Sequence, residues 1–167
     1  LAAEAVLARI PELDFVVLRP TGVYGPRERD YYLMAKSIKS HVDFAVGFKP
    51  QEITFIYVRD LVEAAFLACN GGPSRRAYFL TDGGYYDSRT FSSLLQRAMG
   101  VRFVLRVTSP LWFLRVVCRL SGALARMRGK ASTLNMDKYR ILSQRNWRCN
   151  IRPARELLGY EPHYSLE

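Results

Sequence analysis

The sequence predicts an α/β protein in which strands and helices alternate along the chain. Short runs rich in β-branched and aromatic residues, such as 14–19 and 53–58, lack the apolar–polar alternation of a half-exposed strand. They indicate strands that are buried on both faces. Stretches with strong helix propensity, such as 61–69, lie between these runs and end in Gly and Pro. Strands that alternate with helices indicate βα units and a parallel sheet.

The expected elements follow one another from one end of the chain to the other. The Ala- and Leu-rich start over 1–10 predicts a helix, and a strand over 14–19 leads into a loop over 20–26. We expect Asp60 to cap the helix over 61–69 and Ser88 to cap a helix that runs to residue 99. The remaining expected elements are helices over 31–39, 110–127, 136–142 and 153–158, and strands over 44–47, 53–58, 77–80 and 102–107.

Composition indicates a folded chain of one large domain or two small ones. Of the 167 residues, 49% are hydrophobic and 24% charged, which excludes a disordered or fibrous protein. The net charge is +10, but we expect the short basic clusters at 75–76 and 126–130 to be solvated loops and predict no nucleic-acid site. The cysteines are too widely spaced for a disulfide framework or a zinc site, and no metal site is expected. We expect buried, apolar thiols in a cytoplasmic protein, at Cys69, Cys118 and Cys149.

The loop over 20–26 is the most informative segment. It follows a buried strand and contains two Pro and two Gly, and in open parallel sheets ligands lie beyond the carboxyl ends of the strands. A backbone bent in this way can direct N–H and carbonyl groups at a flat ring that carries an amide. A purely structural turn explains the same residues equally well.

The helix expected over 110–127 is amphipathic and basic. Arg115, Arg119 and Arg126 fall on one face, and the apolar residues fall on the other, at Trp112, Phe113, Val116, Val117 and Leu120. The segment is too short and too charged for an ordinary transmembrane helix. A helix of this kind can make peripheral contact with an anionic membrane or cover a lipidic substrate. We favour the simpler interpretation, in which the apolar face packs on the domain and the Arg face is solvated.

Four segments, in order, resemble the extended short-chain dehydrogenase/reductase family, which comprises NAD(P)-dependent epimerases, dehydratases and 3β-hydroxysteroid-dehydrogenase-like enzymes. Residues 18–26, Leu-Arg-Pro-Thr-Gly-Val-Tyr-Gly-Pro, resemble its L-R-P-x-x-V-Y-G-P segment. Residues 55–64 are similar to its F-x-Y-V-x-D-x-x-x-A junction between strand and helix. Residues 78–83 resemble its N-L-T-D-G strand, and residues 147–162 resemble its closing D-x-x-K-A-x-x-x-L-G-Y-x-P element.

The resemblance implies a cofactor, NAD or NADP, and assigns residues to it. Cofactor contacts are expected from Pro20, Thr21, Gly22 and Val23, with the Val23 N–H as the donor to the nicotinamide carboxamide. Substrate contacts are expected from Tyr24, Arg27 and Tyr31. The family transfers a hydride between the nicotinamide and a carbinol carbon, with a Tyr-x-x-x-Lys pair as acid and base. That pair is expected to precede residue 1, so no residue of this chain is expected to be catalytic.

The same resemblance implies the fold and the domain organisation. Residues 1–75 are expected to form the C-terminal portion of a Rossmann-type parallel sheet that binds NAD(P). Residues 76–167 are expected to form a small, mainly helical substrate-binding domain, although the strand over 77–80 can belong to either part. Such a portion would expose strand edges and bind a dinucleotide weakly on its own. A homodimer is an expectation at the level of the family.

One departure from the family pattern bears on the substrate. Nucleotide-sugar members carry Arg-Asp just before the F-x-Y-V strand, where this chain has Ile53 and Thr54. The loss of a charge-assisted phosphate contact favours a hydroxysteroid-like or other alcohol or ketone substrate. Arg27, Arg29 or Lys49 can replace the missing Arg, so a nucleotide-sugar epimerase or dehydratase stays open. A non-catalytic dinucleotide sensor of the same fold is a further alternative.

Overall fold

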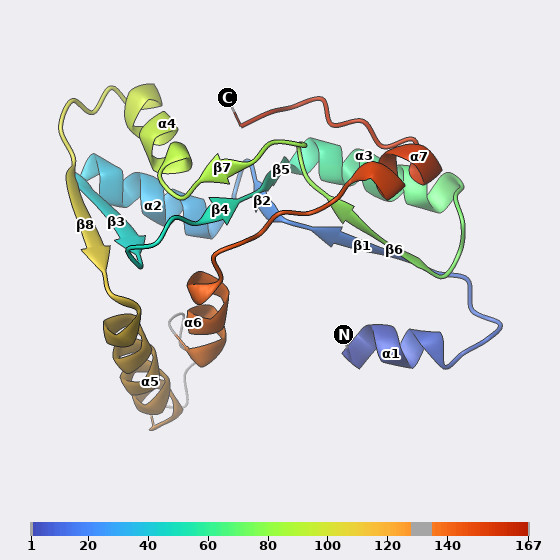
Figure 1. Ribbon diagram of the computed structural model, residues 1–167, viewed down its shortest axis with the longest axis horizontal. Helices are drawn as coiled ribbons and strands as arrows, with labels where there is room; N and C mark the ends of the chain where they lie inside the picture. The colour runs from blue at the N-terminus through green and yellow to red at the C-terminus, as the bar shows by residue number, and fades with distance from the viewer. Residues whose placement is uncertain (1, 128–134, 167) are drawn as a thin grey trace. The chain divides into compact units, whose positions relative to one another are not determined.

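The chain divides into two units, each assembled from segments that lie far apart in the sequence (Figure 1). The computed structural model describes residues 2–127 and 135–166. The first unit comprises 1–28, 54–85 and 148–167, and the second comprises 29–53 and 86–147. The chain therefore leaves the first unit and returns to it twice, and the units do not follow a single division at residue 75. The assignment of 1–75 to cofactor binding and of 76–167 to substrate binding stays a prediction.

The first unit is built on parallel strand pairs, as the alternating sequence predicted. Strand β1 (Val16–Pro20) pairs in parallel with β6 (Arg76–Leu80), with Pro20 opposite Leu80. Strand β2 (Gly22–Tyr24) pairs in parallel with β5 (Phe55–Tyr57), with Val23 opposite Ile56. The helices of this unit are α1 (Ala2–Ala8), α3 (Val58–Asn70) and α7 (Arg152–Leu158).

The core of the first unit joins its three sequence segments. Helices α3 and α7 pack around β6 and β1. The buried residues that form this core are Ile56, Ala64, Tyr78, Leu80, Ile151, Ala154, Leu158 and Tyr160. Helix α7 has Pro153 in its first turn, and Gly159 ends it with a left-handed φ of 68°. These are local signals for helix ends, so the boundaries of α7 agree with the sequence prediction.

Arg75 ties α1 to the rest of the first unit. Its guanidinium donates hydrogen bonds to the carbonyl oxygens of Ala8, Ile10, Pro11 and Leu13 at 2.9–3.2 Å. The cluster at 75–76 was expected to be a solvated loop: Arg75 is exposed and lies in a loop, as expected, whereas Arg76 begins β6. Carbonyl groups beyond the end of a short helix need donors, and this guanidinium supplies them. For the other basic cluster, Arg126 and Met127 end a helix, and 128–130 lie outside the described residues.

One loop prediction, one strand prediction and one cap prediction in this region were wrong. The segment expected as a loop over 20–26 contains β2. The single strand expected over 53–58 is divided at Thr54 into β4 (Glu52–Ile53) of the second unit and β5 of the first. Asp60 is not the N-cap of α3, because the helix already begins at Val58, and its carboxylate is 1% exposed.

The second unit has two strand pairs and four helices among its described residues. Strands β3 (Val42–Val46) and β8 (Leu105–Ser109) pair in parallel, and β4 pairs antiparallel with β7 (Tyr86–Asp87). The helices are α2 (Arg29–Lys39), α4 (Thr90–Ala98), α5 (Leu111–Met127) and α6 (Met136–Ser143). Helix α4 begins two residues after Ser88, which does not cap it, and strand β7 was not predicted.

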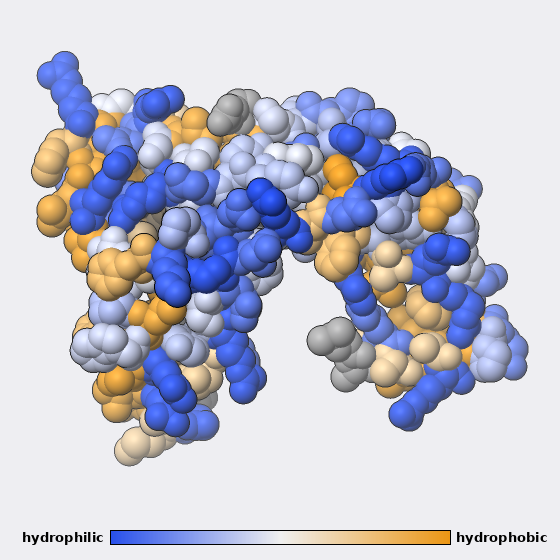
Figure 2. All heavy atoms as spheres, viewed as in Figure 1, coloured by the Kyte–Doolittle hydropathy of each residue, from blue (hydrophilic) through white to orange (hydrophobic). Residues whose placement is uncertain are grey.

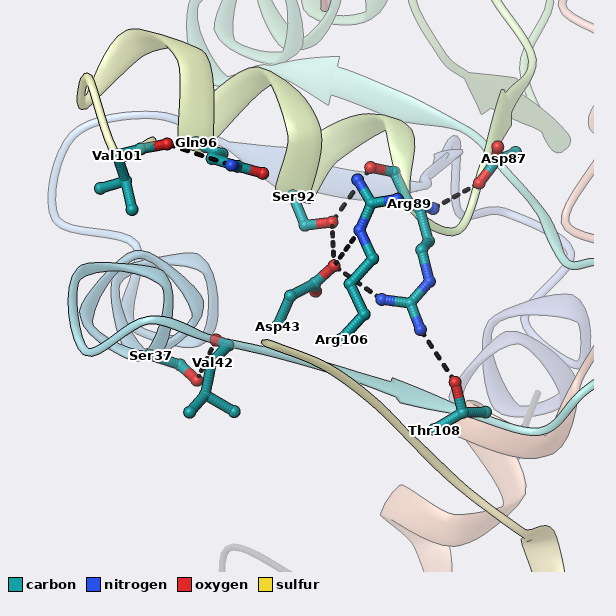
Figure 3. Close-up of polar contacts among 10 residues, drawn as sticks. All are labelled: Ser37, Val42, Asp43, Asp87, Arg89, Ser92, Gln96, Val101, Arg106 and Thr108. Atoms are coloured by element: carbon teal, nitrogen blue, oxygen red, sulfur yellow. Dashed lines mark hydrogen bonds and ion pairs between the residues drawn. The ribbon is translucent and has the colours of Figure 1, made fainter. Parts of the chain in front are cut away.

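A buried carboxylate joins α4 to the β3–β8 pair (Figure 3). Asp43 on β3 is 6% exposed and accepts from Arg89 Nη1 at 2.6 Å and from Ser92 Oγ at 3.1 Å. Arg106 on β8 lies 3.8 Å from the same oxygen, and Arg89 Nη2 also donates to Thr108 Oγ1 at 2.8 Å. A buried charge is stable only when it is paired and hydrogen-bonded, and Asp43 meets both conditions.

The favoured interpretation of the basic amphipathic helix was right for the three arginines, which are exposed, and wrong for most of the apolar face. Helix α5 packs through Leu114 and Cys118, and Trp112, Val116 and Leu120 of its apolar face are exposed. Among the described residues, no helix is both long and apolar enough to span a membrane. The cysteines also differ from one another: Cys118 is buried, Cys149 is half-buried, and Cys69 is exposed near the end of α3. The expectation of a buried thiol was therefore wrong for Cys69.

Candidate functional site

The predicted cofactor segment lies at the carboxyl end of β1, between β6 and β5. The Thr21 N–H donates to the Leu80 carbonyl at 3.2 Å, and its hydroxyl donates to the same oxygen at 3.3 Å. The next N–H, that of Gly22, donates to the Thr54 carbonyl at 3.2 Å. Residues 20–24 are therefore fixed at the edge of the sheet where parallel α/β folds bind ligands.

Val23 differs from the other three predicted cofactor residues in the hydrogen bonding of its main chain. Pro20 has no N–H, and the N–H groups of Thr21 and Gly22 are both bonded within the fold. Successive N–H groups of a strand point to opposite sides. Because the Gly22 N–H points to β5, the Val23 N–H points away from β5. Of these four residues, Val23 is therefore the one whose main chain can donate to a ligand.

Tyr24 is held by the C-terminal segment of the chain. Its hydroxyl donates to the Ser165 carbonyl at 3.0 Å, and its ring lies 5.3 Å from the ring of Tyr57 between centroids. Burial is the main cause that raises the pKa of Tyr24 to about 12, and the nearby Asp82 and Asp60 carboxylates contribute to the same shift. The hydroxyl is therefore protonated at neutral pH and already has an acceptor, so its predicted contact with substrate would come from the ring.

The turn after Tyr24 has an uncommon backbone. Gly25 has a φ of 149°, and a Cβ built on it would lie 2.7 Å from Val58 Cγ1. Arg27 has a φ of 70°, which a residue with a side chain adopts rarely, and its side chain is exposed. The turn thus presents a cation to solvent just after the strand that carries Val23.

The other predicted substrate residue, Tyr31, belongs to the second unit. It lies on α2, and its ring centroid is 4.6 Å from that of Phe91 on α4. The second unit also has an open groove of about 320 Å³. It is lined by the segment after β3 and by the start of α4, including Gly47, Phe48, Lys49, Gln51, Asp87 and Arg89. Lys49, named above as a possible replacement for the missing Arg, is thus on the groove.

No Tyr-x-x-x-Lys was expected within the chain, and this was wrong, because the spacing occurs at Tyr32 and Lys36. Both residues lie on α2, where they are one helical turn apart. Tyr32 is 66% exposed and Lys36 is exposed as well. The structure places this pair in the second unit, whereas Val23 belongs to the first. The spacing alone therefore does not identify it as an acid–base pair.

Asp60 and Tyr160 anchor the C-terminal segment through polar contacts that were not predicted from the sequence. The Asp60 carboxylate accepts the N–H of His163 and the N–H of Tyr164, each at 3.2 Å. The Tyr160 hydroxyl donates to the Thr81 carbonyl at 3.0 Å, and burial raises the pKa of Tyr160. Asp60, Glu63 and His163 lie close enough to share a cation, but both Asp60 oxygens are used by the backbone. Asp60 is about 100 residues from His163 and Tyr164 in the sequence, and no local pattern predicts a contact over that distance.

The chain is similar in sequence to a short-chain dehydrogenase/reductase and shares its fold with solved epimerases. It is 27% identical over 169 aligned residues to short-chain dehydrogenase/reductase family 42E member 1 of Danio rerio, covering 90% of this chain and 42% of that protein. The structure matches UDP-glucose 4-epimerase of Thermotoga maritima with a TM-score of 0.70 at 22% identity, covering 99% of this chain and 47% of the other. No protein-family model matches the chain.

A second solved structure matches the chain with a similar TM-score and coverage. UDP-glucuronic acid 4-epimerase of Bacillus cereus, solved with UDP-glucuronic acid and NAD, matches with a TM-score of 0.69 at 18% identity. The match covers 99% of this chain and 45% of that one. The chain thus spans less than half the length of each of these three proteins. At these identities the solved structures establish the fold and leave the substrate unidentified.

Proposed function

We propose that the chain contributes the nicotinamide-side wall of an NAD(P)-dependent enzyme of the extended short-chain dehydrogenase/reductase family. Its similarity to a short-chain dehydrogenase/reductase and to two epimerases, one of them solved with NAD, supports this proposal. The observation that carries the proposal is the Val23 N–H, which points away from β5 at the carboxyl end of β1. A carboxamide oxygen is a suitable acceptor for such a main-chain donor.

The residues of this chain would hold and orient the cofactor. When bound, NAD(P) supplies the hydride acceptor or donor at its nicotinamide ring. Val23 would donate to the carboxamide, and Pro20, Thr21 and Gly22 would shape the wall beside the ring. Tyr24 does not serve as the acid or base in this proposal, because its hydroxyl is bonded to Ser165 and its pKa is raised.

An alcohol or ketone such as a hydroxysteroid is the substrate class that we propose. Thr54 is 1% exposed and its carbonyl accepts the Gly22 N–H, so this position serves the fold. Ile53 is half-buried in β4 and is apolar. Neither position offers a cation for a diphosphate, which is the contact that a nucleotide sugar would require there.

The cofactor proposal is tested by saturation-transfer NMR of NAD⁺ with the 167-residue chain. This measurement detects weak binding, which is the expected range for part of a cofactor site. We expect the nicotinamide protons to receive more saturation than the adenine protons, because the proposed contact is with the carboxamide. In Val23→Pro the nicotinamide signal should be lost, since Pro has no N–H.

Val23→Ala is the matched control for that variant. It removes most of the side chain and keeps the N–H, so the nicotinamide signal should remain. Pro should be tolerated at this position because the Val23 N–H is not part of the pairing with β5, and circular dichroism checks that both variants fold. Equal nicotinamide signals in Val23→Pro and Val23→Ala, or saturation of the adenine protons alone, would contradict the proposal.

A further inference from the structure

Helix α5 presents an apolar surface that the described residues leave exposed. Trp112, Val116, Leu120 and Leu124 recur at every fourth residue and therefore share one side of the helix. Trp112 is 69% exposed and Leu120 is 66% exposed. With two neighbours on the same side, they form what we call the α5 apolar stripe: Trp112, Phe113, Val116, Leu120, Leu124 and Met127. Single exposed apolar residues are ordinary, whereas a continuous row indicates an interaction surface.

The helix has a separate side for packing. Leu114 is 6% exposed and Cys118 is fully buried, and α5 contacts α6 within the second unit. The stripe lies on other positions of the helix, and its side chains are 46–84% exposed. The apolar residues of α5 thus form two sets, of which one is covered by the protein itself.

A row of arginines borders the stripe. Arg115 follows the buried Leu114, and Arg119 follows the buried Cys118, so at 3.6 residues per turn both lie between the packed side and the stripe. Arg126 falls on the same row, and all three side chains are exposed. Helix α5 contains no Asp or Glu. In Figure 2, the surface over α5 accordingly shows hydrophobic and hydrophilic side chains together.

We propose that the α5 apolar stripe binds the surface of an anionic membrane. Its apolar side chains would enter the boundary between headgroups and acyl chains, and the adjacent arginines would contact lipid phosphates and carboxylates. The helix has 17 residues and three arginines, so it suits the plane of the interface and is too short to cross a bilayer. The net charge of +10 adds attraction to an anionic leaflet.

The positive charge of the chain favours an anionic membrane over a second copy of the chain as the partner of the stripe. Two α5 stripes in contact would bring two rows of arginines together without a carboxylate on either helix. Two chains of charge +10 also repel each other at low ionic strength. An anionic lipid surface has the opposite sign and offers an apolar layer beneath it. This proposal is independent of the proposed nicotinamide site.

Sedimentation with lipid vesicles tests the proposal on the 167-residue chain. We expect binding to vesicles of equal parts phosphatidylcholine and phosphatidylserine, little binding to phosphatidylcholine alone, and weaker binding as salt increases. The double variant Trp112→Gln/Leu120→Gln should bind the anionic vesicles roughly tenfold less well or worse, because it removes apolar surface from the stripe. Arg115→Gln/Arg119→Gln should lose the preference for phosphatidylserine.

The matched control is Val62→Gln/Phe66→Gln on α3. Val62 and Phe66 are apolar like the stripe residues, and their side chains are 50% and 66% exposed. They lie one turn apart on a helix of the first unit that has no row of arginines beside them. This variant should bind vesicles like the wild type. All the substituted side chains are exposed, so circular dichroism and thermal melting should show folded proteins in each case.

A second readout follows Trp112 directly. In a Trp147→Phe background, Trp112 is the remaining tryptophan, and its emission should shift to the blue and resist acrylamide quenching when anionic vesicles are added. Equal binding by the stripe and control variants would overturn the proposal. So would the absence of vesicle binding, or sedimentation equilibrium that shows a dimer dissolved by Trp112→Gln/Leu120→Gln, which would assign the stripe to a second copy.

Discussion

Gly25 is the residue on which the geometry of the candidate cofactor segment depends most directly. Its φ of 149° is unfavourable for a residue with a side chain, and its Cβ would lie 2.7 Å from Val58 Cγ1. We expect Gly25→Ala to lower the free energy of unfolding by about 1–3 kcal/mol, as measured by urea denaturation.

Gly71→Ala is the control for this prediction. Gly71 has an extended φ of 169°, and no heavy atom lies within 4 Å of a Cβ built there. Its substitution should change stability by no more than about 0.5 kcal/mol. If the two variants were equally stable, the turn after Tyr24 would not require glycine.

Single residues also show why only part of the site could be predicted. The Pro and Gly content of 20–26 correctly indicated a bend at the end of a strand, because these residues determine backbone geometry locally. Which N–H group remains available there depends on Leu80 and Thr54, which accept from Thr21 and Gly22 and are remote in sequence. The sequence therefore could not show that the Thr21 and Gly22 N–H groups are bonded within the fold, and the role of Val23 stays a prediction.

At the scale of elements, Asp60 attaches the C-terminal segment to α3. Both of its oxygens accept backbone N–H groups, from His163 and Tyr164. Asn has one oxygen and an NH₂ group, so Asp60→Asn would leave one of these N–H groups facing a donor. We expect a loss of about 1–3 kcal/mol in the free energy of unfolding and faster amide hydrogen exchange at residues 162–165.

Glu63→Gln is the comparison for Asp60→Asn. Glu63 lies one turn along the same helix, 3.4 Å from the His163 ring, and both side chains are more than half exposed. An exposed pair of this kind contributes little, so the change should stay within roughly 1 kcal/mol. Unchanged exchange at 162–165 in Asp60→Asn would show that the segment is held by other contacts.

The elements themselves were predictable where their ends are determined locally. Gly100 and Gly159 follow α4 and α7 with left-handed φ values of 65° and 68°, and both helices end where the sequence indicated. The strands β2 and β7 were missed because two or three residues become a strand only through a partner elsewhere in the chain. For α5, amphipathicity identified an apolar side but could not show that Leu114 and Cys118 are the residues that pack.

For the whole molecule, parallel pairing and alternating order were predictable, and the interleaved units were not. A prediction from the sequence alone assigns neighbouring segments to the same domain. In this chain, the second unit instead combines residues 29–53 with residues 86–147, and residues 54–85 between them belong to the first unit. The contacts that create this arrangement, such as the pairing of β3 with β8, connect residues with no local sequence signal for each other.

The division into two compact units predicts that a change in one unit leaves the other protected. Asp43→Asn removes the charge that pairs with Arg89 and Arg106 in the second unit. Breaking a buried pair costs about 3–5 kcal/mol, and because Arg89 retains partial exposure, we expect the lower end of that range. Hydrogen exchange should then accelerate in β3 and β8 while β1 and β6 keep their protection.

Asp30→Asn provides the control within the same unit. Asp30 pairs with Lys138, but its side chain is 54% exposed, so this variant should leave exchange in β3 and β8 nearly unchanged. Equal acceleration in β1, β6, β3 and β8 after Asp43→Asn would mean that both units unfold as one cooperative structure. In that case the two units would form separate sets of contacts but would unfold together. A ligand held by either unit would then stabilise the whole chain.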